Sequence, residues 1–137
     1  ADEFPDQARP DDFWHSQSSV AFRDFFVWGH DHDFGHGIIR SGAMGPRHIE
    51  ITSEALRLGM LPANLKGKQV LDVGCWSGGD LLVLAGLGAQ VTAMEEHPIA
   101  AKAARKLLEL VGLNAPVIES SLFDDKQEWA RKFDYAY

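Results

Sequence analysis

The chain has 137 residues, with 13 basic and 20 acidic ones and a formal net charge of −7. This length fits a single domain that can bury a core without a structural metal, and the single cysteine, Cys75, excludes an internal disulfide. The acidic balance argues against tight, sequence-independent nucleic-acid binding, which depends on Lys and Arg at phosphates. No signal peptide and no membrane-spanning apolar stretch is recognisable, so we expect a cytoplasmic protein with no membrane partner.

The composition of the chain changes near residue 65. The first 45 residues are rich in aromatic residues, Asp and His, and they contain many Pro and Gly residues, which argue against long regular elements. Later residues alternate between short apolar runs and helical patterns. We therefore expect an amino-terminal cap or lid over residues 1–65 and a second, regular part over residues 66–137.

Two helices are expected in the amino-terminal part. One covers residues 16–26, and a clearer one starts at Pro46, a residue that suits a first helical turn. In the second helix, Ile49, Leu56 and Met60 are spaced for a single apolar face. We therefore expect this face to pack against the rest of the protein.

The pattern from Gln69 onward predicts strands that alternate with helices. The expected strands are QVLDV, QVTAME, PVIES and the beginning of a fourth at FDYAY; the expected helices are DLLVLAGLG, IAAKAARKLLELVG and the short KQEWARK. In the second of these helices the apolar face is expected to contain Ile99, Ala103, Leu107 and Leu110. Such alternation indicates βαβ units and a parallel sheet, hence an α/β fold.

The turn after the first strand contains glycines at positions 74, 78 and 79. Glycines let a backbone approach a ligand closely, and a helix that follows offers unpaired N–H groups. The turn also lies at the carboxyl end of a strand, where open α/β sheets bind ligands. The spacing does not fit the dinucleotide pattern G-x-G-x-x-G, and no lysine follows to make a phosphate loop.

This turn resembles motif I of the class I S-adenosylmethionine-dependent methyltransferases, in which an acidic and an apolar residue precede G-x-G-x-G. The matching residues are Asp72, Val73, Gly74, Cys75, Trp76, Ser77 and Gly78, with Trp76 in the place of the middle glycine. The resemblance implies a Rossmann-like sheet and S-adenosylmethionine as cofactor. It also implies that Asp72 positions the loop and faces the methionyl amino group, while Gly74, Cys75 and Gly78 bring the backbone to the cofactor.

The resemblance continues at the ends of the next two strands. The family places an acidic residue after the second strand, where it accepts hydrogen bonds from the ribose hydroxyls, and here Glu95 stands there with Glu96 beside it. After the third strand the family often carries an Asp that binds the adenine amino group. Ser121 stands at that position, and Ser121 and Leu122 are therefore expected to border the adenine.

The family's sheet places its first strand between the second and the fourth. Residues Lys132 to Tyr135 look like the start of that fourth strand. By this resemblance the sheet is incomplete, and one side of the first strand is expected to expose unpaired backbone groups. We expect the remainder of the chain or a partner to complete the sheet, and we expect the catalytic residues to lie beyond Tyr137.

A histidine-rich segment, WGHDHDFGH, places His30, His32 and His36 within seven positions. His and Asp are metal ligands, but the binuclear hydrolase pattern H-x-H-x-D-H is not met, and we assign no metal site. One alternative is a loop whose imidazoles and carboxylates pair with each other or with the backbone. The other is a lid over the cofactor, with Trp28 and Arg40 as further contacts.

Together these patterns predict the cofactor-binding portion of an S-adenosylmethionine-dependent methyltransferase. The alternative is a non-catalytic binding or scaffold module that keeps the turn without a working pocket. A long aromatic amino-terminal part also resembles enzymes that modify tRNA wobble uridines. The net charge of −7 nevertheless favours a small-molecule acceptor over RNA.

Overall fold

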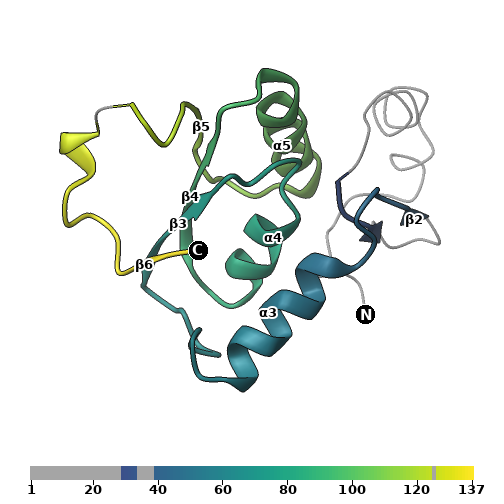
Figure 1. The fold of residues 1–137 in the computed structure, drawn as a ribbon, viewed down its shortest axis with the longest axis horizontal. Coiled ribbons are helices and arrows are strands. Elements are labelled where there is room, and N and C mark those ends of the chain that lie inside the picture. The colour runs from purple at the N-terminus through teal and green to yellow at the C-terminus, as the bar shows by residue number, and fades with distance from the viewer. Residues whose placement is uncertain (1–28, 34–38, 125) are drawn as a thin grey trace.

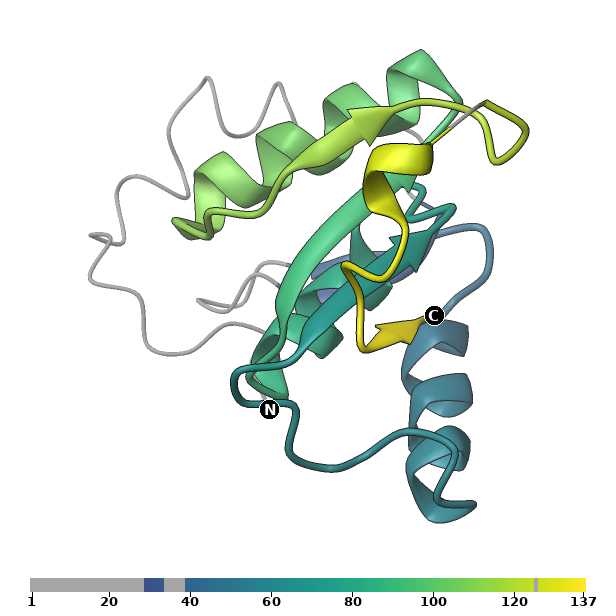
Figure 2. The same cartoon turned by 90° about the vertical axis from the view of Figure 1, so that its left-hand side faces the viewer.

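The computed structural model describes residues 29–33, 39–124 and 126–137; His36 and the helix expected over residues 16–26 lie outside them. The described chain builds an open sheet with α4 and α5 on one of its faces and α3 beside α4 (Figures 1 and 2). These elements are α3 (Arg47–Arg57), α4 (Gly79–Gly86) and α5 (Pro98–Val111). No helix in the described part is long and apolar enough to cross a membrane.

The sheet has four parallel strands in the order β5-β4-β3-β6. They are β3 (Gln69–Val73), β4 (Gln90–Glu95), β5 (Val117–Glu119) and β6 (Tyr135–Ala136). The pairs Asp72–Ala93 and Val73–Met94 bring the ends of β3 and β4 side by side. The predicted α/β fold with a Rossmann-like parallel sheet is confirmed, and the segment expected as the short helix KQEWARK contains a 3₁₀ turn, η1 (Gln127–Trp129).

The expectation that one side of the first strand is unpaired is wrong. β6 is short, but it pairs with β3 through Val70–Tyr135 and Leu71–Ala136. The ladder continues past β6, because the N–H of Val73 donates to the carbonyl of Tyr137 at 2.9 Å. Both sides of β3 are therefore covered. Within the described part of the chain, the sheet's open edges are β5 and the outer side of β6.

The hydrophobic core lies between the sheet and the helices α4 and α5. Its fully buried side chains include Leu65, Val70, Leu81, Leu84 and Leu107, and burying each leucine stabilises the fold by about 2 kcal/mol. In α5 the buried face runs through Ala100, Ala104, Leu107 and Val111, which is the spacing of one helical stripe. Ile99 lies one position off this stripe and is 61% exposed, so its expected place on the apolar face is wrong.

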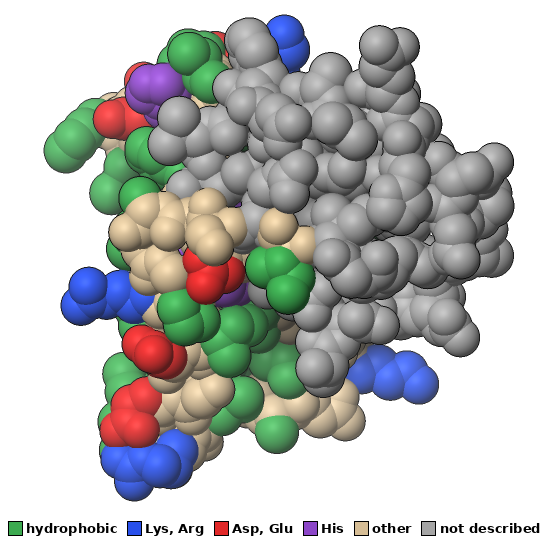
Figure 3. Space-filling model, turned by 90° about the vertical axis from the view of Figure 1, so that its right-hand side faces the viewer, with side chains coloured by type: hydrophobic (Ala, Val, Ile, Leu, Met, Phe, Trp, Pro, Cys, Tyr) green, Lys and Arg blue, Asp and Glu red, His purple; other side chains and the backbone are tan. Residues whose placement is uncertain are grey.

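The apolar face expected for α3 is also wrong. Ile49 is 39% exposed and Met60 is 73% exposed, whereas the buried residues of this helix are His48 and Thr52. Only Leu56 of the predicted face packs against the core. The buried inner side of the helix is polar, and its isoleucines, Ile49 and Ile51, remain at the surface. Figure 3 shows hydrophobic side chains at the surface of one face, with acidic side chains among them.

Residues 29–33 and 39–45, which we call the β1–β2 segment, contain the short antiparallel strands β1 (His32–Asp33) and β2 (Ile39–Arg40). The Asp31 carboxylate accepts the N–H of Gly42 at 2.8 Å, and the Asp31 N–H donates to the carbonyl of Gly45 at 2.9 Å. The N–H of Met44 donates to the carbonyl of Gly29 at 2.8 Å. These bonds fix the segment as a compact unit beside the start of α4.

Candidate functional site

The loop between β3 and α4 turns sharply at three left-handed residues. They are Gly74, Trp76 and Gly78, with φ values of 73°, 49° and 101°. Glycine takes this conformation freely, but a residue with a Cβ atom loses about 1–2 kcal/mol there. Trp76 is therefore held in a strained conformation by its surroundings. At Gly78 a Cβ atom would also come within 3.2 Å of Leu107 Cδ2, so α5 packs directly under the loop.

Glu95 is the residue that holds this loop to the end of β4. Its side chain is only 6% exposed. One carboxylate oxygen accepts the N–H of Trp76 at 2.8 Å, and the other accepts the N–H of His97 at 2.8 Å. Each oxygen of an ionised carboxylate has a further acceptor position, so Glu95 can still accept hydrogen bonds from a ligand.

A pocket of about 390 Å³ opens at the ends of β3 and β4. It is lined by Val73, Gly74, Trp76, Met94, Glu95, Glu96, Ser120, Leu122 and Phe123. Five of the predicted site residues are among them, namely Gly74, Trp76, Glu95, Glu96 and Leu122. The lining residues are apolar, small or acidic, and none is Lys, Arg or His. Such a lining suits an uncharged or cationic ligand better than a phosphate.

Ser120 and Phe123 were missed by sequence reasoning. Phe123 is 95% exposed and forms part of the pocket rim with Leu122, which is 64% exposed. The signal that could have found it is the apolar pair Leu122–Phe123 in an otherwise polar loop directly after a strand. An exposed aromatic ring in such a place is typical of a binding surface.

The Ser121 side chain is not among those lining the pocket, and its role at the adenine stays a prediction. The loop is shaped instead by Asp124, whose carboxylate accepts the Ser120 hydroxyl at 2.6 Å and the Ser121 N–H at 2.8 Å. The Ser120 hydrogen bond, followed by the Ser121 N–H, lowers the pKa of Asp124. Lys126 also holds this loop in place, because its ammonium group donates to the Ser121 carbonyl.

The opposite side of the β3–α4 loop is buried and polar. Asp72 and Ser77 are each 2% exposed, and an oxygen of each has no hydrogen-bond partner among the described residues, as is also true of Asp80 Oδ1. Burial raises the pKa of Asp72 to about 7, and the charges of Asp80 and Glu95 add to this effect. Burial also raises the pKa of Asp80, while His30 and His48 oppose the increase.

The histidines of the β1–β2 segment lie on this buried side rather than in the pocket lining. The rings of His30 and His48 stack with their centroids 4.5 Å apart, and His32 lies 6.2 Å from His48. A Cβ atom at Gly79 would meet His30 Nδ1 at 2.7 Å, so the stack rests on the start of α4. In the described part of the chain no group of three or more His, Cys, Asp or Glu residues could hold a metal ion.

Cys75 is enclosed by the loop rather than presented to a ligand. Its side chain is 1% exposed, and its thiol approaches the carbonyl of Trp76 at 3.5 Å. Burial, with the charge of Asp72 next in importance, strongly raises the pKa of the thiol. The thiol therefore stays protonated at neutral pH and is not a nucleophile.

The fold of this chain is similar to that of solved methyltransferase structures. A 16S rRNA methyltransferase from T. thermophilus, solved with AdoMet and guanosine, matches with 31% identity over 75% of this chain and a TM-score of 0.57. A SAM-dependent methyltransferase from Agrobacterium tumefaciens matches with 24% identity over 71% and a TM-score of 0.53. A protein-L-isoaspartate O-methyltransferase matches with 15% identity over 99% and a TM-score of 0.55.

The chain has the class I S-adenosylmethionine-dependent methyltransferase fold. It spans 26% of the rRNA methyltransferase chain, 32% of the Agrobacterium tumefaciens chain and 38% of the isoaspartate methyltransferase chain. No protein-family model and no curated protein matches the sequence. Most of the residues predicted for a cofactor site lie together in this fold. They stand in β3, in the loop at residues 74–78 and at the end of β4.

Proposed function

We propose that this chain is the S-adenosylmethionine-binding portion of a methyltransferase. The observation that carries the proposal is the buried carboxylate of Glu95 at the end of β4, fixed by two backbone N–H groups beside a left-handed glycine turn. A carboxylate held in this way presents its remaining acceptor positions to a ligand in a constant geometry. Two neighbouring hydroxyl groups, such as those of a ribose, match such an acceptor.

The other residues of the pocket fit the rest of a nucleoside. Leu122, Phe123 and Met94 supply apolar surface for a base, and Ser120 supplies a hydroxyl at its edge. The volume of about 390 Å³ lies within the range of small-molecule pockets. Because Glu95 and Glu96 are the lining residues with a formal charge, the pocket favours a nucleoside that carries no phosphate.

The remaining contacts predicted for the cofactor come from the backbone of the loop and from a side chain on its buried side. Gly74 and Gly78 bring the chain close to the ligand, and Asp72 would stand behind the loop toward the methionyl amino group, as the family resemblance implies. When bound, S-adenosylmethionine supplies a methyl group on a positively charged sulfur for transfer to a nucleophile. The contribution of this chain is binding and orientation, which is a large share of such catalysis.

For the acceptor, we propose a small molecule rather than RNA, because the net charge is −7 and the pocket lining contains no basic side chain. We further propose that another strand, from the same chain or a partner, pairs with the outer side of β6. That edge offers unpaired backbone groups among the described residues, as every open sheet edge does.

The test is isothermal titration of the full-length protein with S-adenosylmethionine and S-adenosylhomocysteine. We expect both to bind, and we expect Glu95→Ala to weaken binding by about 100-fold, because it removes the ribose acceptor and the support of the loop. Glu119→Ala is the matched control, since Glu119 also ends a strand but is exposed and pairs with Arg105 at 3.5 Å. Absence of binding by the wild-type protein would instead support a non-catalytic module.

A further inference from the structure

Trp76 is the residue at which the loop departs from the glycine of the family motif, and it connects two separate parts of the protein. It lines the pocket beside Glu95, and it also lies against Gly29 of the β1–β2 segment. We propose that Trp76 is a positioning residue that couples the β1–β2 segment to the nucleoside pocket through its contact with Gly29. This inference rests on the proposed function and adds a residue outside the pocket that controls its affinity.

The contact between Gly29 and Trp76 leaves no room for a side chain at position 29. A Cβ atom on Gly29 would lie 2.3 Å from Trp76 Cδ1 and 2.4 Å from Trp76 Nε1. Both distances are far below contact distance, so the edge of the indole occupies the space that a side chain of residue 29 would take. The φ angle of Gly29 is not in the left-handed region, so this space is the reason for glycine here.

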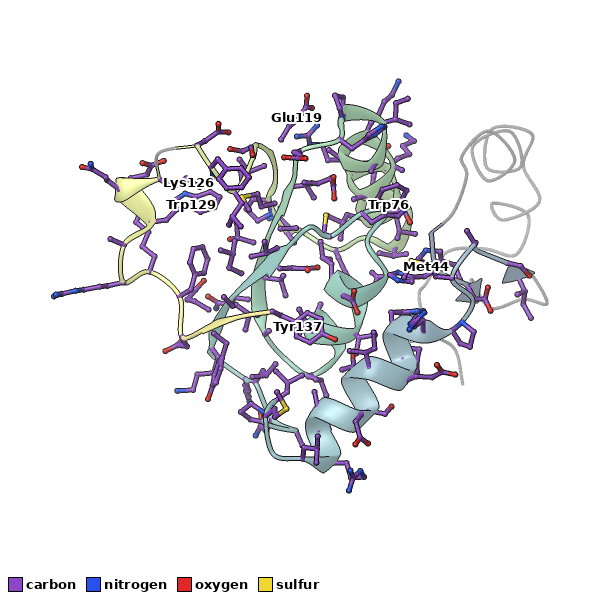
Figure 4. The ribbon with its side chains drawn as sticks, in the orientation of Figure 1. Met44, Trp76, Glu119, Lys126, Trp129 and Tyr137 are labelled. Carbon is purple, nitrogen blue, oxygen red and sulfur yellow. The ribbon has the colours of Figure 1, made fainter. Side chains whose placement is uncertain are left out.

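The β1–β2 segment cannot easily move away from the indole. The Gly29 carbonyl accepts the N–H of Met44, and the next residue, His30, stacks on His48 of α3 at 4.5 Å. Gly42 is packed against the His30 backbone, where a Cβ atom would come within 2.3 Å of the carbonyl carbon. Figure 4 shows Trp76 on the side of the molecule that also holds Met44. A side chain at residue 29 would therefore displace the indole.

On the pocket side, a displaced indole disturbs a residue that lines the binding surface. Trp76 is 44% exposed and forms a wall of the pocket, with its ring 6.1 Å from that of His97. The backbone N–H of Trp76 donates to the Glu95 carboxylate, and the backbone is in the strained left-handed region at φ 49°. The backbone N–H and the indole belong to one residue, so a shift of the indole also disturbs the hydrogen bond that orients Glu95.

The experiment uses the full-length protein, with S-adenosylhomocysteine as the probe in isothermal titration. We expect Gly29→Ala to weaken binding by about tenfold, because an added methyl group in a packed contact displaces its neighbour. Gly86→Ala is the matched control, since its Cβ atom would meet nothing within 4 Å, and its affinity is expected to equal that of the wild type. In a Trp76→Gly background, Gly29→Ala is expected to cause no further loss, because the indole is gone.

A second measurement keeps the proposal testable if Gly29→Ala fails to fold. In the wild-type protein, S-adenosylhomocysteine is expected to slow hydrogen exchange at the amides of Asp31 and Met44, which lie outside the pocket lining, because coupling between two sites is reciprocal. Trp76→Gly, at saturating ligand, is expected to abolish this slowing. Either wild-type affinity in Gly29→Ala or unchanged exchange at both amides overturns the coupling. A wild-type protein that binds no ligand overturns the proposed function instead.

Discussion

The two sides of the β3–α4 loop handle polar groups in opposite ways. On the pocket side, Glu95 is buried and both of its carboxylate oxygens accept backbone N–H groups. On the other side, Asp72, Ser77 and Asp80 each have a buried oxygen without a hydrogen-bond partner among the described residues. Two neighbouring strands therefore carry different carboxylates: Glu95 of β4 has an N–H donor at each oxygen, and Asp72 of β3 has one oxygen without a donor among the described residues.

The difference predicts how substitutions on the two sides of the loop change the stability of the protein. A carboxylate with two N–H donors stabilises both itself and the backbone that supplies them. A buried carboxylate with an oxygen that has no donor lowers stability, since burial disfavours its charged form, and burial is the main reason why the pKa of Asp72 is raised to about 7. We therefore expect substitutions on the pocket side to destabilise the protein and a neutral substitution at Asp72 to stabilise it.

The largest effect on stability is expected from Glu95→Ala. This change leaves the N–H groups of Trp76 and His97 without their acceptor. Hydrogen bonds to a charged group contribute about 1.5–3 kcal/mol each, so we expect the free energy of unfolding to fall by about 3 kcal/mol. Urea denaturation measures it, with the exposed neighbour Glu96 as control, where Glu96→Ala is expected to change stability by less than about 0.5 kcal/mol. Equal losses in both variants would contradict the role given to Glu95.

The second effect is a pH-dependent stabilisation by Asp72→Asn. The folded pKa of about 7 lies above the unfolded value, so the wild-type protein loses stability as pH rises from the unfolded pKa through the folded pKa. Asparagine has no charge to bury and is free of this loss. We expect Asp72→Asn to stabilise the protein by about 2 kcal/mol more near pH 8 than near pH 5, as measured by urea denaturation at both values.

Asp124→Asn is the control with the opposite sign. The pKa of Asp124 is lowered by the Ser120 hydroxyl and the Ser121 N–H, so its contribution to stability is present at neutral pH and disappears as pH falls through the folded pKa. This variant is expected to be less stable than the wild type at neutral pH and to approach it in acid. If Asp72→Asn showed the same pH profile as Asp124→Asn, the assignment of a raised pKa to Asp72 would be wrong.

The sheet half of the molecule was predictable from the sequence because its local signals agree with its packing. Short apolar strands, the glycines at positions 74 and 78, and Gly112 at the end of α5 each act within a few residues. The same holds for Glu95, whose position follows from the end of β4. Trp76 could be predicted as a departure from the motif, but its left-handed conformation and its contact with Gly29 depend on distant parts of the chain.

The amino-terminal part was less predictable because its packing is set by polar residues. The aliphatic spacing in α3 pointed to Ile49 and Met60, yet the helix buries His48 and Thr52. The partners that orient it are His30, 18 positions earlier in the numbering, and Tyr137, at the other end of the sequence. No periodicity within the helix contains that information.

A smaller effect is expected from Gly79→Ala on the buried polar side. Its Cβ atom would come within 2.7 Å of His30 Nδ1 and 3.1 Å of His48 Cδ2, so the histidine stack must shift. We expect a loss of about 1–2 kcal/mol in the free energy of unfolding. Gly86→Ala in the same helix meets nothing within 4 Å and is expected to stabilise by about 0.5–1 kcal/mol. Thermal or urea denaturation compares the two, and similar changes in both would show that the stack tolerates a methyl group.

The smallest expected effect concerns the hydroxyl pair that joins α3 to β6. The Thr52 hydroxyl donates to the carbonyl of His48 at 2.8 Å, and it lies 2.9 Å from the hydroxyl of Tyr137. Figure 4 shows Tyr137 at the end of β6, on the side of α3. Because the threonine hydrogen is already donated to His48, the tyrosine must be the donor in the pair.

Because the tyrosine is the donor, removing its hydroxyl and removing the threonine hydroxyl are expected to lower the stability by different amounts. Tyr137→Phe leaves Thr52 with its bond to His48, so we expect a loss of about 0.5 kcal/mol, whereas Thr52→Val removes both bonds of a buried group and is expected to cost about 1 kcal/mol. A double-mutant cycle measured by urea denaturation isolates the coupling, expected at about 0.5 kcal/mol. A coupling of zero would show that β6 is held to β3 by its backbone ladder alone and that α3 does not secure the edge of the sheet.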